Sequence, residues 1–421
     1  MKINLAYGEK GLLIDLPDNL TTVISPTYTP GLEDEQAALW HSLNKPIDAP
    51  PLRNWFNSKS KVCITFTDIT RATPNNRLIP WILKYLSFIP EKNITLLNSL
   101  GSHRPNTDEE LKKMLTTEVV KRYKIVHNEP ENIESHIKVG NLKDGTPAFV
   151  SRYLLESDVR IITGFIEPHF FAGFSGGPKG ILPGVAYIDT IMANHRAENI
   201  SNPNATFGIT EGNPIWEEMR DIALKSGPSF LINVTLNEDK KITGIFAGDI
   251  IAAHQKGTEF VKKHAMQKVK ERFDIVITTN SGYPLDLNLY QGVKGMSAAA
   301  RIVKPGGVII LACECRDGVP FNSSYEKLLR SGKTADELLK MIMNSGKVVP
   351  DQWQVQIQAQ IQKQATVYLY SSLEEDVVKA AHLIPCKDIE KTVAEIISAR
   401  GNDVKIAVMP YGPLTIPYIE E

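Results

Sequence analysis

Two histidines and a lysine lie within one glycine-rich segment of the chain. The segment runs from Thr163 to His195 and contains His169, Lys179 and six glycines. It follows the strand-like run 159–162, and glycine allows the backbone to turn sharply and to approach another group closely. Because ligands of α/β proteins bind where parallel strands end in loops, the segment predicts a ligand site.

Residues 173–180 of this segment, GFSGGPKG, are similar to the phosphate-binding P-loop but do not match it. A proline replaces the second glycine of G-x-x-x-x-G-K-[ST], and a glycine replaces the hydroxyl residue that binds magnesium. The backbone N–H groups of Ser175, Gly176 and Gly177 are still predicted to bind an anion. The alternative interpretation is a tight glycine turn that leaves Lys179 in solvent.

Polar side chains follow several predicted strands, at the points where these strands end. They are Asp68 and Arg71 after strand 61–67, His103 and Arg104 after strand 93–97, His127 after strand 123–126, and Glu167 and His169 after strand 159–162. Parallel strands end at one edge of a sheet, so these groups are expected to converge on one crevice. Two facing histidines suit acid–base chemistry near neutral pH, and an arginine suits a bidentate grip on a carboxylate.

A histidine taken alone is more often an ordinary surface or core residue than a functional one. This interpretation is given to His41, His136, His254, His264 and His382.

Strands and helices alternate along most of the chain. This alternation predicts an α/β fold of two domains with mainly parallel sheets flanked by helices. The predicted N-terminal domain spans residues 1–268, and the C-terminal domain spans residues 269–409. The last dozen residues of the chain are expected to rejoin the first domain.

The composition argues against some partners. The 47 basic and 48 acidic side chains leave a formal net charge of −1, which gives no support for nucleic acid or an anionic membrane as partner. No apolar run approaches the ~20 residues of a membrane span, and the first residues lack the apolar core of a signal peptide. Four scattered cysteines favour a reducing cytoplasm, and Cys313 and Cys315 are interpreted as packing residues.

Five short sequence pieces occur together in the chain. They are DITR at 68–71, GSHR at 101–104, EPHFFAGFSGGPKGILPG at 167–184, NH at 194–195 and YQGVK at 290–294. With these pieces the chain resembles the lactate racemase (LarA) family, the nickel-pincer racemases and epimerases of 2-hydroxy acids. The resemblance covers nearly the whole chain, and the piece at 167–184 is long and specific.

The resemblance implies an active site in the cleft between the two domains and a nickel-containing cofactor. In the family this cofactor is pyridinium-3-thioamide-5-thiocarboxylic acid mononucleotide, which is joined to a lysine through its thioamide. It holds nickel in an S–C–S pincer, and a histidine is the remaining protein ligand. Lys179 matches the lysine, and His195 matches the nickel ligand. Further contacts to the cofactor are expected from Asp68, Ser175, Gly176, Gly177 and Trp353.

The resemblance also implies roles at the substrate. The acid–base histidines match His103 and His169, and the residues around the substrate match Arg71, Tyr290, Gln291 and Lys294. A lone histidine is too weak a base for the α-proton of a hydroxy acid, so the implied reaction removes hydride from Cα while a histidine takes the hydroxyl proton. Hydride then returns to either face of the planar 2-keto acid, which interconverts D- and L-lactate or a related small 2-hydroxy acid.

Other functions remain open at this point. A racemase or epimerase of malate or of a longer 2-hydroxy acid would use the same residues. A nicotinamide-dependent hydroxy acid dehydrogenase would share the hydride chemistry, but the chain lacks a well-placed G-x-G-x-x-G after a strand. A non-catalytic nucleotide- or metal-binding protein could share the fold. For a racemase, proteins that build the cofactor and insert nickel are expected partners.

Two phenylalanines beside His169 bear on the size of the substrate. Adjacent side chains on an extended segment point to opposite faces, so at most one of Phe170 and Phe171 is expected to line the pocket. An aromatic wall leaves room for a methyl group, which favours lactate. Arg104 is the residue that argues for malate instead, because its side chain could bind the second carboxylate of malate.

Overall fold

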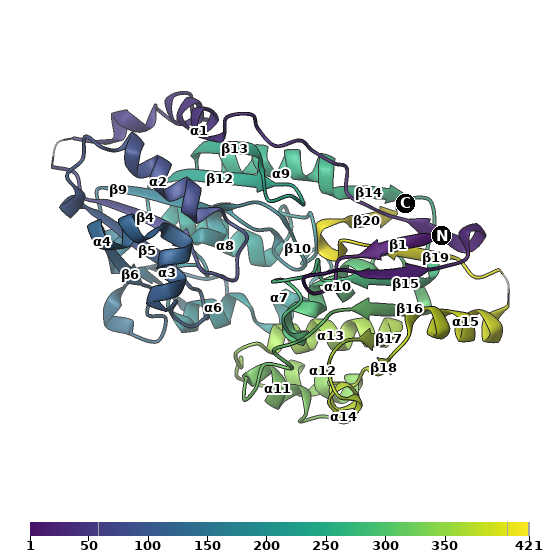
Figure 1. Ribbon diagram of the computed structural model, residues 1–421. Helices are drawn as coiled ribbons and strands as arrows, with labels where there is room; N and C mark the ends of the chain where they lie inside the picture. Colours follow the sequence, from purple (N-terminus) through teal and green to yellow (C-terminus); the bar gives the residue numbers. More distant parts are fainter. Residues whose placement is uncertain (58, 402, 420–421) are drawn as a thin grey trace. The chain divides into compact units, whose positions relative to one another are not determined.

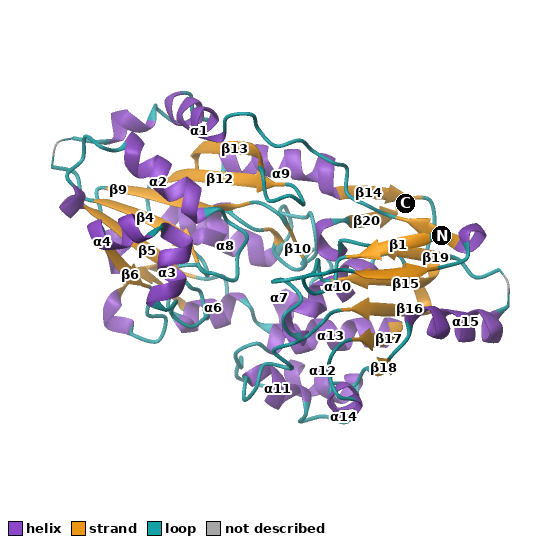
Figure 2. Cartoon of the chain, viewed as in Figure 1, coloured by secondary structure: helices purple, strands orange, loops and turns teal. Residues whose placement is uncertain are grey.

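The structure is a computed structural model that describes residues 1–57, 59–401 and 403–419 (Figure 1). Contacts along the chain divide it into two compact units. We call Tyr28–His195 with Asn202–Lys263 the central unit, and Met1–Thr27, Arg196–Ser201 and His264–Glu421 the terminal unit. Both units contain mainly parallel sheets and helices, which confirms the predicted α/β fold class (Figure 2).

A six-stranded sheet forms the middle of the central unit. Its strand order is β13 (Ile242–Asp249), β12 (Phe230–Leu236), β9 (Val159–Phe165), β4 (Val62–Thr67), β5 (Ile94–Ser99) and β6 (Lys124–His127). Neighbouring strands pair in parallel, except β12 and β13, which are antiparallel. The four strands predicted to end in polar groups are therefore consecutive in the sheet and run in one direction.

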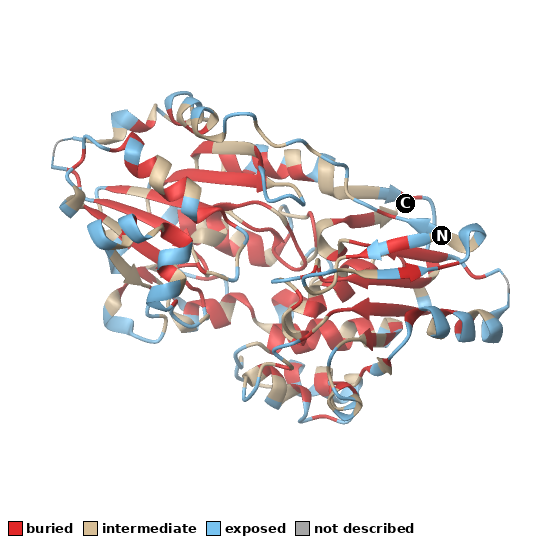
Figure 3. Cartoon of the chain, in the orientation of Figure 1, coloured by how far each residue is buried: buried red, intermediate tan, exposed pale blue. Residues whose placement is uncertain are grey.

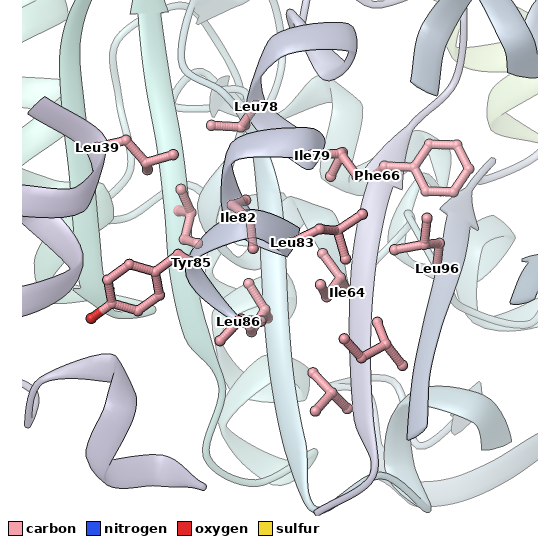
Figure 4. Packing of buried hydrophobic residues seen from close by; sticks show 14 of the residues in the cluster. Leu39, Ile64, Phe66, Leu78, Ile79, Ile82, Leu83, Tyr85, Leu86 and Leu96 are labelled. Atoms are coloured by element: carbon pink, nitrogen blue, oxygen red, sulfur yellow. The ribbon is translucent and has the colours of Figure 1, made fainter. Parts of the chain in front are cut away.

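Helices cover this sheet and bury its apolar side chains. They are α1 (Glu35–Asn44), α2 (Asn75–Tyr85), α3 (Asp108–Leu115), α4 (Thr117–Arg122), α5 (Arg152–Leu155), α6 (Ile188–Asn194), α8 (Pro214–Lys225) and α9 (Ala252–Ala265). Leu78 and Ile82 are one helical turn apart on α2, so both face the core and pack in one cluster with Ile64 and Phe66 of β4 (Figure 4). Burial of each such side chain stabilises the fold by about 1.5–3 kcal/mol relative to exposure.

Short antiparallel pairs complete the central unit. They are β7 (His136–Asn141) with β8 (Pro147–Ser151), and β10 (Pro168–His169) with β11 (Gly173–Phe174). The second pair follows β9 directly and carries one of the candidate histidines.

A second six-stranded sheet, parallel throughout, forms the middle of the terminal unit. Its strand order is β18 (Ile384–Cys386), β17 (Ala365–Tyr370), β16 (Val303–Ala312), β15 (Phe273–Thr279), β19 (Ile406–Met409) and β3 (Thr21–Val23). The helices of this unit are α7 (Ala197–Ser201), α10 (Leu289–Ala300), α11 (Ser324–Leu329), α12 (Ala335–Met343), α13 (Gln352–Gln364), α14 (Glu375–Ala380) and α15 (Ile389–Arg400). Figure 3 shows the inner strands buried and the outer faces of several helices exposed. Among the residues that the structure describes, no helix combines the length and apolar character needed to cross a membrane.

The division of the chain differs from the predicted boundary at residue 268. Strand β3 pairs with β19, and the hairpin of β1 (Lys2–Leu5) and β2 (Leu12–Asp15) packs into the core of the terminal unit. Near the other end of the chain, β20 (Ile416–Ile419) pairs with β14 (Met266–Val269) inside the same unit and does not rejoin the central one. These pairings join segments far apart in the chain, so no local pattern indicates them.

Candidate active site

Asp68 and His103 form a close pair at the ends of two neighbouring strands. Asp68 follows β4 and His103 follows β5, and Asp68 Oδ2 lies 2.6 Å from His103 Nδ1. Asp68 Oδ1 accepts hydrogen bonds from the backbone N–H and the hydroxyl of Thr70, at 2.7 and 2.5 Å. Because a carboxylate only accepts hydrogen bonds, Nδ1 of His103 carries a proton, and in the neutral form of the ring the lone pair is on Nε2. The predicted convergence of these two strand ends is confirmed.

The Asp68 carboxyl is held in its charged form. It is 3% exposed, and burial alone would raise its pKa. The hydrogen bond and the charge of His103, followed by the charge of Arg71 and the bond from Thr70, outweigh burial and hold the pKa of Asp68 well below its usual range. Both carboxylate oxygens are engaged within the protein, so these contacts indicate that Asp68 orients His103.

His169 lies on the hairpin of β10 and β11 and has a different hydrogen-bond pattern. The backbone N–H of Ala172 donates to His169 Nδ1 at 3.2 Å. Nδ1 therefore carries a lone pair, and the proton of the neutral ring is on Nε2.

Both neighbouring phenylalanines pack against His169. The ring of Phe170 is stacked on His169 with centroids 4.9 Å apart, and the ring of Phe171 meets it edge-on at 4.5 Å. The prediction that these two side chains point to opposite faces is wrong. Residues 170–172 form the turn between β10 and β11 instead of an extended strand, so side-chain alternation does not apply to them.

Phe171 also connects His169 to Lys179 and His195. Its ring centroid lies 5.2 Å from the centroid of His195 and 6.0 Å from Nζ of Lys179. The glycine-rich segment 163–195 thus brings both histidines and the lysine around one aromatic ring.

His195 is a buried, neutral imidazole. It follows α6, is 3% exposed, and donates from Nδ1 to the carbonyl oxygen of Ile191 at 3.0 Å. Burial and, second, the charge of Lys179 lower its pKa to about 3, although the bond to Ile191 acts in the opposite direction. A neutral ring with its proton on Nδ1 presents the Nε2 lone pair, which is the form that binds a metal.

Lys179 projects from a short 3-10 turn, Gly177–Gly180, whose approach is fixed by hydrogen bonds. The Ser175 hydroxyl donates to Phe165 O and accepts from Glu167 N, both at 2.9 Å, and the Ser175 N–H donates to Glu167 O at 2.9 Å. Gly177 N donates to Asn233 Oδ1 at 2.7 Å. Two of the three N–H groups predicted to bind an anion are therefore used within the protein, and the loop is built as a tight turn that presents Lys179.

Four predicted site residues belong to the terminal unit and are described within it. Tyr290, Gln291 and Lys294 lie on α10, and Trp353 lies on α13. Trp353 Nε1 donates to the Tyr290 hydroxyl at 3.1 Å, so the structure brings these two together. Gln291 N donates to the Asn288 side chain at 3.1 Å, a helix cap that fixes the start of α10.

The structure does not join all the predicted polar residues to this site. Arg104 forms a bidentate pair with Glu110, at 2.9 and 2.7 Å, and its side chain is 64% exposed. His127 is half-buried on the edge strand β6, where burial lowers its pKa. His254, interpreted as an ordinary surface or core residue, is buried, and its Nε2 lies 2.9 Å from Ser175 O of the lysine loop, a contact that no pattern on its own helix indicates.

Comparison with known proteins places the chain in a family. Models for the N-terminal and the C-terminal domain of lactate racemase match residues 7–208 and 268–416. The chain is 36% identical over 418 residues to a lactate racemase of Thermoanaerobacterium thermosaccharolyticum, with 97% of both chains covered. It is 38% identical over 382 residues to a lactate racemase of Lactiplantibacillus plantarum, with 90% of both covered.

Solved structures give the same result. The lactate racemase apoprotein from Thermoanaerobacterium thermosaccharolyticum superimposes with a TM-score of 0.92 at 34% identity, and both chains are fully covered. A protein from Thermotoga maritima, with a TM-score of 0.70 at 19% identity, covers 93% of this chain and 100% of its own and supports the fold alone. The fold and the site define an α/β enzyme that combines histidines with a lysine-bearing loop. The chain belongs to the lactate racemase family, and the enzyme is an isomerase.

Proposed function

We propose that this protein is a racemase that interconverts D- and L-lactate, or a related small 2-hydroxy acid, by hydride transfer to and from a nickel-pincer nucleotide. The observation that carries the proposal is the placement of Lys179 and the neutral His195 around Phe171. Lactate is proposed because the two curated relatives above are named lactate racemases.

The residues present fit the implied cofactor. Lys179 is half-buried on a turn with a fixed backbone, which suits a covalent tether. His195 offers one neutral imidazole with its tautomer fixed by Ile191, which suits a single protein ligand to nickel. When bound, the nickel-pincer nucleotide would supply acceptance and return of the Cα hydride.

The protein itself would move the hydroxyl proton. Nε2 of His103 carries a lone pair, and the charged Asp68 stabilises the imidazolium that forms when this nitrogen takes the proton. Nε2 of His169 carries a proton in the neutral ring and would donate a hydrogen bond to the substrate oxygen. We propose that Arg71 binds the carboxylate and that Lys294, Gln291, Tyr290 and Trp353 keep the substrate and cofactor roles that the family resemblance implies.

The proposal extends to partners and location. Lys179 would have to be modified after synthesis, so proteins that build the cofactor and insert nickel are proposed partners. A reducing cytoplasm is proposed as the location, supported by four cysteines that are all buried free thiols. Cys313 and Cys315 lie side by side with sulfur atoms 3.4 Å apart.

The experiment that tests the function uses the full chain produced together with cofactor-building enzymes. Intact mass should exceed the chain mass by one cofactor, and chiral chromatography should show L-lactate converted to a D,L mixture. Lys179→Ala should lose both the added mass and the racemisation, while Lys256→Ala, an exposed lysine on α9, should keep both. Full racemisation by Lys179→Ala protein of unmodified mass would refute the proposal.

A further inference from the structure

His254 lies outside the roles assigned above, although it is buried against the lysine loop. It belongs to the first turn of α9, is 1% exposed, and its ring is stacked on that of Trp216 with an interplanar angle of 16°. Its Nε2 lies 2.9 Å from the carbonyl oxygen of Ser175. Because a carbonyl only accepts, Nε2 carries the proton and donates it.

The side chain of Asn233 on β12 also binds the lysine loop. It is fully buried, and its Oδ1 accepts the hydrogen bond from Gly177 N at 2.7 Å, while its Nδ2 donates to Ile232 O at 3.1 Å. A buried donor or acceptor without a partner costs about 1–3 kcal/mol. If the loop moved away, Oδ1 of Asn233 and the Nε2–H of His254 would each lose the hydrogen bond described above.

The two side chains also fill the space that side chains on the loop would need. Gly176 and Gly177 have φ of 76° and 54°, in the left-handed region that favours glycine. A Cβ on Gly177 would lie 2.4 Å from Cγ of His254, and a Cβ on Gly176 would lie 2.3 Å from Oδ1 of Asn233. The backbone at both glycines therefore packs so closely against these two residues that a side chain on either glycine would clash with them.

The hydrogen bonds of this loop orient the side chain of Lys179. Its backbone N–H donates to Gly176 O at 3.1 Å, which closes the turn immediately after the held residues. The turn starts from a carbonyl bound by His254 and an amide bound by Asn233, and it ends with Nζ of Lys179 above the ring of Phe171.

We propose that His254 and Asn233 are positioning residues for Lys179, which fix the loop so that the amine is presented for covalent attachment of the cofactor. This inference rests on the proposed function in so far as Lys179 is the tether. The hydrogen bond from His254 to Ser175 is the part of the arrangement that substitution can isolate.

Two substitutions separate the hydrogen bond from the volume of the ring. His254→Gln keeps an N–H donor at a position comparable to Nε2, whereas His254→Phe keeps the ring and its stacking on Trp216 but removes the donor. His382 offers matched controls, because its Nε2 lies 2.8 Å from Leu329 O in the terminal unit. The controls are His382→Gln and His382→Phe.

The first measurement uses apo-protein, so it does not depend on the cofactor. Trace acetylation with acetic anhydride, read by peptide mass spectrometry, gives the reactivity of Lys179 relative to the exposed Lys256. Hydrogen exchange of the peptide that spans 173–181 gives the order of the loop. His254→Phe should change the ratio of Lys179 acetylation to Lys256 acetylation. It should also raise the hydrogen exchange of the peptide 173–181 about tenfold, the effect of losing one buried hydrogen bond. His254→Gln and both His382 variants should remain near wild type.

The second measurement is the fraction of chains that carry the cofactor, read by intact mass after co-production with the cofactor-building enzymes. His254→Phe should load about tenfold less than wild type at limiting cofactor, and His254→Gln should restore loading. Equal loading and loop exchange in wild type and His254→Phe would overturn the inference, as would equal losses in His254→Phe and His254→Gln. If His254→Phe does not fold, Asn233→Asp, which keeps the acceptor, and Asn233→Leu, which removes it, give the same comparison. Wild-type protein without an adduct would instead count against the proposed function, and the apo-protein measurement would still decide this inference.

Discussion

In the neutral rings, Nε2 carries a lone pair in His103 and a proton in His169, because Nδ1 donates a hydrogen bond in His103 and accepts one in His169. Asp68 accepts a hydrogen bond from Nδ1 of His103, whereas the N–H of Ala172 donates to Nδ1 of His169. One ring therefore offers a lone pair at Nε2 and the other offers a proton. In the proposed racemisation of two mirror-image substrates, the two histidines would therefore have different roles in the ground state.

The first prediction concerns the tautomer of His103. In Asp68→Asn, the amide can donate to Nδ1, which places the proton on Nε2 and removes the base. Nitrogen-15 NMR of histidine-labelled apo-protein should show Nε2 of His103 changing from unprotonated to protonated. Racemisation by the loaded enzyme should fall by about 10²–10⁴-fold, the usual contribution of a positioned base.

Thr70→Val is the matched control for this prediction. It removes one hydrogen bond to Asp68 Oδ1 and leaves the contact of Asp68 with His103 in place. The tautomer should not change in this variant. An unchanged His103 signal in Asp68→Asn would show that Asp68 does not set the tautomer.

The second prediction concerns nickel. His195→Ala removes the proposed ligand but leaves Lys179, so nickel should be lost to a greater extent than the organic cofactor. His136→Ala is the control, because His136 is also buried and its Nδ1 also donates to a carbonyl, that of Asn132 at 2.9 Å. Metal analysis together with intact mass decides the outcome. Stoichiometric nickel and unchanged turnover in His195→Ala would assign the ligand role elsewhere.

The third prediction concerns the stability of the apo-protein in mild acid. Burial lowers the pKa of His254 from its usual 6.5 to about 4, although the bond to Ser175 acts in the opposite direction. Between these values the unfolded chain binds more protons than the folded one, so the free energy of unfolding falls as the pH decreases. Each pH unit below the unfolded pKa costs on the order of 1.4 kcal/mol for this group.

His254→Gln should therefore lose less stability than wild type between about pH 7.5 and pH 5.5, by on the order of 1 kcal/mol. Urea unfolding at both pH values gives the comparison, and His382→Gln, which removes a half-buried ring in the terminal unit, is the control. Parallel losses in wild type and His254→Gln would show that His254 does not remain neutral in the folded protein.

The fourth prediction concerns substrate size. Arg104 is already bound to Glu110 through two hydrogen bonds, which leaves it poorly suited to a second carboxylate. The loaded enzyme should have a higher kcat/KM for lactate than for malate, 2-hydroxybutyrate or phenyllactate. Phe170→Ala should shift this preference towards larger side chains, because the Phe170 ring is stacked on His169. A wild-type preference for malate or phenyllactate would contradict this account of the pocket.

The sequence was sufficient for the features that depend on local pattern. Strand β4 and strand β5 were expected from their apolar runs, and the meeting of Asp68 with His103 followed from parallel strand ends. The turn at residues 170–172 was missed because two aromatic residues after a histidine look like a continued strand. The contact of His254 with the lysine loop could not be predicted, because it depends on the distant Ser175 and Gly177 and nothing on its own helix indicates it.

The pairing of β3 with β19 has a consequence for how the chain is made. Residues 21–23 pair with residues 406–408, so this pairing can form only after nearly all of the chain has been synthesised. The central unit ends at residue 263, and all of its strands are available well before then. Domains generally fold as units during synthesis, so the growing chain is expected to hold a folded central unit while the edge of β3 remains unpaired. An unpaired strand edge can pair with other chains, and β3 is open to such pairing during this interval.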